Sequence, residues 1–576
     1  MKSSLQSLTG SLPAPRRRVL TLGLLLVIGL ADAAFGASQT EAPPRLVLQI
    51  TVDQLRGDML PRLRERFGSG GIRLLLDHGV YYANAHYDTA NTVTCSGHAV
   101  LVTGADAAEH GIAGNMWFDR ELGRPVYCVR DPRYPTVGAP SKPGGGLSPA
   151  HLTSTTVGDE LVSASGHRAR VFAIAGKDRS AIIPGGRLGK AFWFSEAAGG
   201  FVTSRYYYDT LPNWAAAWND RKLYKRYEKA GWKLLHPLET YINAALASNP
   251  HAHVRTISGR TFPHMLTSGA NADLLKALRF TPFLDELTAD FALELLEQEK
   301  LGQRLESSSG EEVGPVHAAT DYLSISFSAT DYVGHTYGPN SIEAEDNLLR
   351  LDATLARLFA YIDRTIGLSN TIVVLSSDHG TDDIPEERKH LGYDADRLAG
   401  EALRTKLDAA LKQRFEATES LVAAVVPPGV YLDRANVAAL RLDPAVVEAA
   451  VVEVLQREPG VAYAFTRTDL LAGRIGRTPL LDRVQRAFHP TRSGDVVVIQ
   501  RQFWYFDDEP DYYAAMHGSP YTYDTHVPIL MLAPGARRAT IHDPVTPAQI
   551  APTIAALLGV KPPSGCACGA PLPGVF

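Results

Sequence analysis

Carboxylate, imidazole and hydroxyl side chains recur in short segments along the sequence, and together they could catalyse a reaction. These residues are Asp53, Thr94, Asp331, His335, Asp378, His379 and His526. Burying the carboxylates and imidazoles together without partners would cost free energy, and a divalent metal removes that cost. Mixed Asp and His ligands suit zinc, and the set suffices for a pair of metal ions bridged by a substrate. The sequence therefore predicts a two-metal site served by a hydroxyl nucleophile.

Thr94 is the candidate nucleophile. It precedes a small, turn-forming Cys-Ser-Gly sequence, and an apolar run from Ala99 to Val102 follows. This pattern predicts a strand or loop that leads into a helix N-terminus, where unpaired N–H groups and the helix dipole favour an anion. A threonine hydroxyl becomes a good nucleophile only when something removes its proton. The alternative interpretation is that Thr94 is only the helix N-cap.

Buried strands are the elements that must position these residues. Near-continuous apolar, β-branched runs occupy residues 45–53, 168–176, 322–331, 371–377 and 525–532. Such runs are typical of parallel strands that are buried on both faces. In open α/β sheets ligands bind at the carboxyl ends of the strands, which is where most of the candidate residues fall. We therefore expect an α/β fold with a central, mostly parallel sheet flanked by helices, with amphipathic helices at 288–300 and 343–366.

Two cations, Lys177 and Arg179, directly follow the run at 168–176. Charged side chains are usually exposed, so a solvated loop is the simple interpretation. Beside an anionic substrate the same pair would form a clamp.

The sequence pattern of alternating strands and helices is interrupted twice between the predicted core strands. We expect an aromatic-rich insertion at 181–320 and a second, mixed insertion at 385–490, both over the active-site edge. The core then consists of residues 38–180, 321–384 and 491–576.

The N-terminus and the composition limit the cellular context. Three arginines at 16–18, an apolar run at 19–30 and a small-residue stretch at 31–37 describe a secretory signal peptide, residues 1–37. The apolar run is short for a membrane anchor, so we expect a periplasmic or secreted protein. The net charge of -5 and the lack of a long Lys/Arg run in the mature chain argue against a nucleic-acid-binding surface.

The cysteines are Cys95, Cys128, Cys566 and Cys568. Four cysteines allow three complete pairings, and the sequence does not choose among them. A Cys95–Cys128 bond would fasten the nucleophile loop to a neighbouring segment, whereas the alternative is a buried free Cys95. The spacing lacks paired Cys-x-x-Cys motifs, so a zinc site made of cysteines is not expected.

The order of the motifs resembles that of the alkaline phosphatase superfamily over nearly the whole mature chain. The matching motifs are Asp53, Thr94-x-x-Gly97-His98, His110-Gly111-Ile112 with Asn115, Asp331-x-x-x-His335, Asp378-His379-Gly380 and Thr525-His526. Lys177-x-Arg179 and the Asn115 segment resemble the bacterial phosphate-irrepressible alkaline phosphatases, which use a threonine nucleophile. Nucleotide pyrophosphatases/phosphodiesterases are similar in metal set and nucleophile but lack the Lys-x-Arg pair. One departure is Cys95-Ser96 after Thr94, where family members often carry a proline before the glycine.

The resemblance implies a role for each residue. One zinc would be held by Asp331, His335 and His526, and the other by Asp53, Asp378 and His379 with Thr94 Oγ1. Asn115, Lys177 and Arg179 would bind the non-bridging phosphoryl oxygens.

The implied function is that of an exported, zinc-dependent alkaline phosphatase.

 It would hydrolyse phosphate monoesters through a phosphothreonine intermediate, as a phosphoric monoester hydrolase acting on small phosphorylated substrates, and we expect a monomer. The alternative within the superfamily is a phosphodiesterase/nucleotide pyrophosphatase. A sulfatase is disfavoured, because Cys95-Ser96-Gly97 does not match the signal for formylglycine formation. A secreted binding protein that retains the metals without turnover is the alternative from a different class.

Overall fold

The structure, a computed structural model, describes residues 43–140, 144–252, 260–266, 271–303, 319–507, 513–567 and 569–576. The signal peptide predicted for residues 1–37 and Cys568 lie outside these ranges. Among the described residues, no helix is long and apolar enough to cross a membrane.

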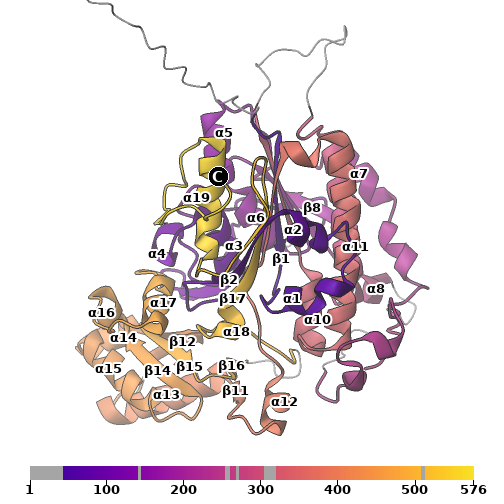
Figure 1. Cartoon of the computed structure of the whole chain (residues 1–576). Helices are drawn as coiled ribbons and strands as arrows, with labels where there is room; N and C mark the ends of the chain where they lie inside the picture. The colour runs from indigo at the N-terminus through magenta and orange to yellow at the C-terminus, as the bar shows by residue number, and fades with distance from the viewer. Residues whose placement is uncertain are drawn as a thin grey trace, which may run out of the picture. The chain divides into compact units, whose positions relative to one another are not determined.

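A ten-stranded sheet runs through the centre of the fold (Figure 1). Its strands, in spatial order, are β18 (Ala539–Ile541), β2 (Val80–His86), β17 (His526–Leu532), β10 (Thr371–Ser376), β1 (Leu46–Val52), β9 (Asp321–Phe327), β6 (Val171–Ala175), β7 (Lys190–Ser195), β8 (Gly200–Ser204) and β5 (Thr136–Val137). The central strands β10, β1, β9, β6 and β7 are parallel to one another. Antiparallel β17 and β8 flank them. The predicted α/β fold with a mostly parallel central sheet is confirmed.

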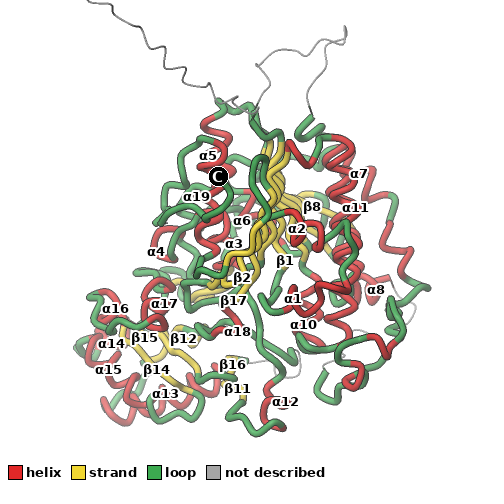
Figure 2. The backbone as a smooth tube through the Cα atoms, in the orientation of Figure 1, coloured by secondary structure: helices red, strands yellow, loops and turns green. Residues whose placement is uncertain are grey.

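Helices cover both faces of this sheet, as Figure 2 shows. In β1, Leu48 and Ile50 pack into one apolar core and Val47 packs into the other, because alternate side chains of a strand point to opposite faces. The first core is closed by α2 (Ile72–His78), α9 (Phe283–Gln298) and α11 (Ile342–Thr365). The second core is closed by α3 (Thr94–Thr103), α5 (Val157–Ala164), α6 (Asp178–Gly185) and α19 (Ile550–Leu558). The helices predicted at 288–300 and 343–366 correspond to α9 and α11.

Shorter elements connect these layers. They are α1 (Met59–Leu63), α4 (Ala107–His110), α7 (Asn213–Asp220), α8 (Asn271–Leu278), α10 (Ala329–Tyr337) and α18 (Thr522–Thr525), and the hairpin of β3 (Met116–Asp119) and β4 (Arg124–Tyr127). Of these, α10 follows β9 directly and the β3–β4 hairpin begins just after Asn115, so both lie next to candidate site residues.

The first insertion is shorter than predicted. β7 and β8 belong to the central sheet, so the core continues to Ser204 rather than ending at residue 180. The aromatic residues that suggested an insertion, Tyr206-Tyr207-Tyr208, Trp214 and Trp218, all follow β8. Phe192, Trp193 and Phe201 of β7 and β8 are buried in the cores on the two faces of the sheet. Aromatic residues favour strands as well as loops, and their pattern alone does not name the partner strand.

The second insertion is longer than predicted and forms its own four-stranded antiparallel sheet. The spatial order of the strands is β12 (Val422–Val426), β13 (Gly429–Leu432), β15 (Val496–Gln500) and β14 (Val461–Thr466). A two-stranded sheet of β11 (Asp396–Leu398) and β16 (Trp504–Phe506) lies nearby in the chain. The helices of this region are α12 (Pro385–His390), α13 (Gly400–Phe415), α14 (Arg434–Ala439), α15 (Pro444–Leu455), α16 (Arg467–Leu471) and α17 (Pro479–Ala487).

The assignment of residues 491–500 to the core is therefore wrong. β15 pairs with β13 and β14 instead of with a core strand. A run of valines and isoleucine is compatible with a strand of the central sheet or of the four-stranded sheet. The apolar pattern indicates only that the strand is buried, and not which strands it pairs with. Among the described residues, the central sheet resumes with β17.

Candidate active site and metal centre

Polar residues gather where the central parallel strands end. Asp53 follows β1 directly, Lys177 lies two residues after β6, and Asp378 lies two residues after β10. Helix α10, which begins two residues after β9, carries Asp331 and His335. Because the carboxyl ends of parallel strands meet at one edge of the sheet, side chains distant in sequence converge there.

Two groups of side chains at this edge have the spacing of metal ligands. The first group is Asp53, Asp331 and His379, and the second is Asp331, His335 and His517. In each group the ligand atoms lie within 4.8 Å of one another. The two groups share Asp331, so the arrangement suits two neighbouring ions that share a cluster of carboxylates.

His526 does not belong to this cluster, and its predicted role as a metal ligand is corrected. Its ring stacks on His86 with centroids 4.8 Å apart, and its Nε2 donates to the carbonyl oxygen of Ala83 at 3.0 Å. The ring also packs so closely against Gly57 that a Cβ there would lie 2.5 Å from Nε2. His517, which sequence reasoning missed, takes the expected place beside Asp331, with its Nε2 3.6 Å from Asp331 Oδ1.

The histidines of the cluster share one orientation. In each, Nδ1 donates a hydrogen bond to a main-chain carbonyl, which fixes the tautomer and leaves Nε2 to bind a metal. The acceptors are Ala515 for His335 (2.6 Å), Gly380 for His379 (3.0 Å) and Thr92 for His517 (2.8 Å). Main-chain contacts of this kind are the usual support of histidine ligands.

Several buried polar atoms in the cluster have unused capacity to bind a cation. They are both carboxylate oxygens of Asp53, Oδ2 of Asp378 and Nε2 of His379. Burial raises the pKa of Asp53 well above its ordinary value, and the negative charges of Asp378 and Asp331 add to this effect. Asp378 Oδ2 lies 3.5 Å from His379 Nε2, so these atoms are near one another. Lys177 Nζ, 2.7 Å from Asp53 Oδ2, and His98 Nδ1, 3.2 Å from Asp378 Oδ2, are positive or polar neighbours of these oxygens. Closely spaced buried carboxylates that repel one another still fit a divalent cation.

Lys177 supplies positive charge inside the cluster. Its Nζ lies 2.7 Å from Asp53 Oδ2 and 2.5 Å from Asp331 Oδ2, and the side chain is almost fully buried. Burial alone lowers the pKa of Lys177, but the carboxylates of Asp331 and Asp53 raise it above its ordinary value. The lysine therefore stays charged, and the interpretation of Lys177 as a solvated surface residue is wrong.

Thr94 is the first residue of α3, and the structure does not support the N-cap interpretation. The N-cap is Val93, and no side chain caps this helix end. Instead, Thr94 Oγ1 lies 3.4 Å from Nη2 of Arg179, which can donate to it. Arg179 Nη1 is also 3.3 Å from the hydroxyl of Tyr127. The hydroxyl of Thr94 thus faces a guanidinium at the positive end of a ten-residue helix.

Asn115 lies beside the start of α3. Its Oδ1 accepts the main-chain N–H of Cys95 at 2.9 Å, which identifies Nδ2 as the amide atom that remains to donate. Cys95 forms a disulfide with Cys128, with an S–S distance of 2.01 Å. This resolves the alternative left open by the sequence, and no described cysteine is free.

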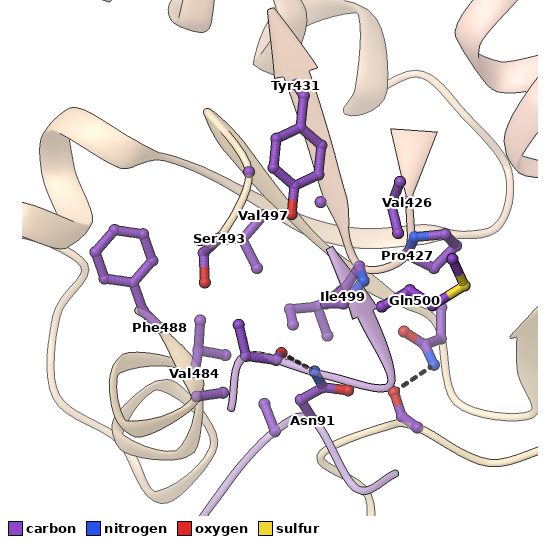
Figure 3. A pocket seen from close by; sticks show the side chains of 18 residues that line it. Asn91, Val426, Pro427, Tyr431, Val484, Phe488, Ser493, Val497, Ile499 and Gln500 are labelled. Carbon is purple, nitrogen blue, oxygen red and sulfur yellow. Dashed lines mark hydrogen bonds between the residues drawn. The ribbon is translucent and has the colours of Figure 1, made fainter. Parts of the chain in front are cut away.

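An apolar cavity of about 520 Å³, part of it open to solvent, lies between the second insertion and the loops that carry Asn115 and His517 (Figure 3). It is lined by residues such as Phe488, Val497 and Ile499 from the insertion and Asn91 from the loop before Thr94. Its lining contains no Asp, Glu, His, Lys or Arg. We therefore assign the chemistry to the strand ends and not to this cavity.

Known proteins resemble the chain over most of its length. Residues 47–520 match the profile of the type I phosphodiesterase / nucleotide pyrophosphatase family. Alkaline phosphatase PhoV of Synechococcus elongatus is 34% identical over 535 residues, which cover 92% of each chain. Alkaline phosphatase PafA of Elizabethkingia meningoseptica is 34% identical over 566 residues, which cover 96% of this chain and 98% of PafA.

A solved structure agrees with these matches. The crystal structure of a PafA variant, substituted at one threonine, one asparagine, one lysine and one arginine, is similar with a TM-score of 0.84 and 32% identity. The match covers 93% of this chain and 99% of that one. The fold and the site define a hydrolase of the alkaline phosphatase superfamily. Within it, the chain belongs to the type I phosphodiesterase / nucleotide pyrophosphatase family, and its alkaline phosphatase relatives confirm the predicted class, a phosphomonoesterase.

Proposed function

We propose that this chain is an exported, zinc-dependent alkaline phosphatase that hydrolyses phosphate monoesters through a phosphothreonine intermediate on Thr94. The observation that carries the proposal is a pair of cations, one beside Thr94 and the other in the adjoining carboxylate cluster. Arg179 Nη2 lies 3.4 Å from Thr94 Oγ1, and Lys177 Nζ lies 2.7 Å from Asp53 Oδ2 in the adjoining cluster. Two cations suit a dianionic monoester better than a monoanionic diester.

The PafA variant supports the same set of residues. Its substituted threonine, asparagine, lysine and arginine follow one another in the order and with the separations of Thr94, Asn115, Lys177 and Arg179. We propose the corresponding roles here, with Thr94 as nucleophile and the other three as ligands of the phosphoryl oxygens.

The chemistry would proceed in two displacements at phosphorus. Thr94 Oγ1 attacks the phosphorus, the ester oxygen leaves on the opposite side, and a water molecule then hydrolyses the phosphothreonine. Arg179 and the N-terminus of α3 stabilise the negative charge on Thr94 Oγ1, while Asn115 Nδ2 and Lys177 donate to the non-bridging oxygens. Bound zinc would lower the pKa of the threonine hydroxyl and stabilise the leaving oxygen. Because each displacement inverts the phosphorus, the overall reaction retains its configuration.

The metal ligands that we propose differ from the sequence-based set at one position. One ion would be held by Asp331, His335 and His517. The other would be held by Asp53, Asp378 and His379, with Thr94 Oγ1 as a further ligand. Oδ1 of Asp53 and Nε2 of His379, which have no hydrogen-bond partner, support this assignment.

The second candidate is a phosphodiesterase/nucleotide pyrophosphatase, which the description of the matching family favours. The deciding experiment measures zinc content together with kcat/KM for 4-nitrophenyl phosphate and bis(4-nitrophenyl) phosphate. We expect about two zinc ions per chain and a strong monoester preference. A diester preference with the same metal content would move the enzyme to the phosphodiesterase branch.

A double variant tests the cations directly. Lys177→Ala with Arg179→Ala should lower monoesterase activity far more than diesterase activity, because the diester carries one negative charge fewer. Equal losses on both substrates would refute the role of the pair. Export and the monomeric state are tested separately, by sequencing the N-terminus of the mature protein and by light scattering.

A further inference from the structure

Asn115 is held at two points by residues that are joined to each other. Its side-chain Oδ1 accepts the N–H of Cys95 at 2.9 Å, and its main-chain oxygen accepts the N–H of Cys128 at 3.0 Å. Cys95 and Cys128, which lie 33 residues apart in sequence, are linked by a disulfide. The three residues therefore form a closed ring of one covalent bond and two hydrogen bonds.

The ring connects two elements of the proposed active site. Cys95 follows Thr94 in the first turn of α3, whereas Cys128 follows the last residue of β4. Asn115 precedes β3, the other strand of the same hairpin. The disulfide thus fastens the hairpin to the helix end that carries the nucleophile.

The two cysteines of this ring are buried, whereas Asn115 is partly accessible. Cys95 and Cys128 are 0% and 1% exposed, while Asn115 is only partly buried. Because Oδ1 is occupied, the amide cannot turn over without losing a hydrogen bond, and Nδ2 keeps one direction. A donor fixed before substrate binds stabilises a transition state better than a mobile one.

We propose that the Cys95–Cys128 disulfide is a positioning element that holds the Asn115 amide against Thr94, so that Nδ2 meets a phosphoryl oxygen. This inference rests on the proposed function of the site. Opening the disulfide leaves each cysteine N–H in place on its own segment, but the two segments are then free to separate. The amide loses its alignment, and a displacement of about 1 Å at a reacting group can lower the rate by as much as about 100-fold.

A positioning role is distinguishable from a contribution to stability. A disulfide also stabilises the fold by restricting the unfolded chain, and that effect appears in the melting temperature whether or not Asn115 is present. Positioning affects kcat/KM well below the melting temperature and requires the Asn115 amide. The two roles are therefore separated by combining changes at Cys128 and Asn115.

The experiment is a double-mutant cycle with Asn115→Ala and Cys128→Ala, assayed with 4-nitrophenyl phosphate on zinc-loaded protein. We expect Asn115→Ala to lower kcat/KM by about 100-fold, as loss of one oxyanion donor does. Cys128→Ala should lower it by about 10-fold, with unchanged zinc content. The double variant should match Asn115→Ala within about twofold, because the two changes act on the same contact. Orthophosphate inhibition gives a second readout, and its inhibition constant should follow the same non-additive pattern.

Independent losses would overturn the proposal, since Cys128→Ala would then lower kcat/KM by the same factor with and without the Asn115 amide. An unchanged kcat/KM in Cys128→Ala would overturn it as well. If that variant does not fold, native wild-type protein and Asn115→Ala are instead reduced with a phosphine and compared. Cys566→Ala is the matched control, because Cys566 is also disulfide-bonded but lies in the C-terminal segment beyond α19. A wild-type enzyme without monoester turnover refutes the proposed function, whereas an active one with independent losses refutes only the positioning role.

Discussion

Replacing His517 should weaken metal binding, whereas replacing His526 should not. His517 Nε2 lies 3.6 Å from Asp331 Oδ1, inside one of the two ligand groups, and its ring stacks on His379 with centroids 3.6 Å apart. The ring of His526 instead stacks on His86, outside both groups. His517→Gln and His526→Gln are therefore a matched pair that separates the structural assignment from the sequence-based one.

The size of the expected loss of zinc affinity follows from the number of metal ligands that remain. Loss of His517 leaves Asp331 and His335 as the donors of their group. Changes in residues that merely support a ligand lower metal affinity by about 10- to 100-fold, so loss of a donor should cost at least about 100-fold, or about 3 kcal/mol. In His526→Gln the amide can still donate to Ala83, so zinc affinity should stay within about twofold and the lost ring stacking should cost about 1 kcal/mol of stability.

The assay is a competition titration of metal-free protein with zinc and a chromophoric chelator, supported by metal content and melting temperature. The two variants are compared at equal fractions of folded protein. A loss of zinc affinity in His526→Gln with normal affinity in His517→Gln would contradict the assignment and restore the sequence-based set.

Three further predictions concern single residues. Thr94→Ala should abolish formation of a phosphoenzyme from labelled monoester while zinc content stays unchanged, because the Asp and His donors remain; surviving phosphoenzyme would exclude Thr94 as the nucleophile. Asp524→Ala should weaken zinc binding about 10-fold, because Asp524 Oδ2 accepts from the N–H groups of Gly518 and Ser519, which follow His517. Asp524→Asn keeps an oxygen acceptor and should retain most of the affinity, so equal losses in the two variants would argue against this role. Burial raises the pKa of Asp285 from 3.8 to about 7. The folded state then binds the proton more tightly than the unfolded state, and stability falls as the pH rises through this interval. The melting temperature of Asp285→Asn relative to wild type should therefore increase between pH 4 and pH 8, and a constant difference would show that Asp285 titrates normally.

The strand-end residues were predictable because their positions follow from local sequence. A continuous apolar run identifies a buried strand, and the polar residues just beyond it must lie at the edge of the sheet. Asp53 and Asp378 were identified in this way. Asp331 and His335 lie one helical turn apart on α10, so their shared face also follows from the spacing.

His517 was not predictable by this argument. It lies in the loop before α18, outside any strand end, and only the following glycine, with a φ of 111°, signals a special backbone conformation. His526 was a reasonable but wrong choice, because it begins β17 at the same edge of the sheet. In the pairing of β17 with β2, His526 lies opposite His86, and the two rings stack on each other. The ring of His526 therefore contacts His86 and does not belong to the candidate metal cluster. Strand pairing of this kind depends on the whole fold.

Thr92 connects the loop of the proposed nucleophile, Thr94, with the loop of the proposed metal ligand, His517. Its carbonyl oxygen accepts from Nδ1 of His517 at 2.8 Å, and its hydroxyl donates to the carbonyl oxygen of Ser519 at 2.8 Å. Thr92 is two residues before Thr94, so the loop of the nucleophile and the loop of His517 share two hydrogen bonds although they lie far apart in sequence. A displacement of either loop must move the other or break these bonds. If the proposed roles hold, we expect metal affinity and the position of Thr94 to be coupled, so that a change in the loop of His517 should affect the rate of attack even when the metal is saturating.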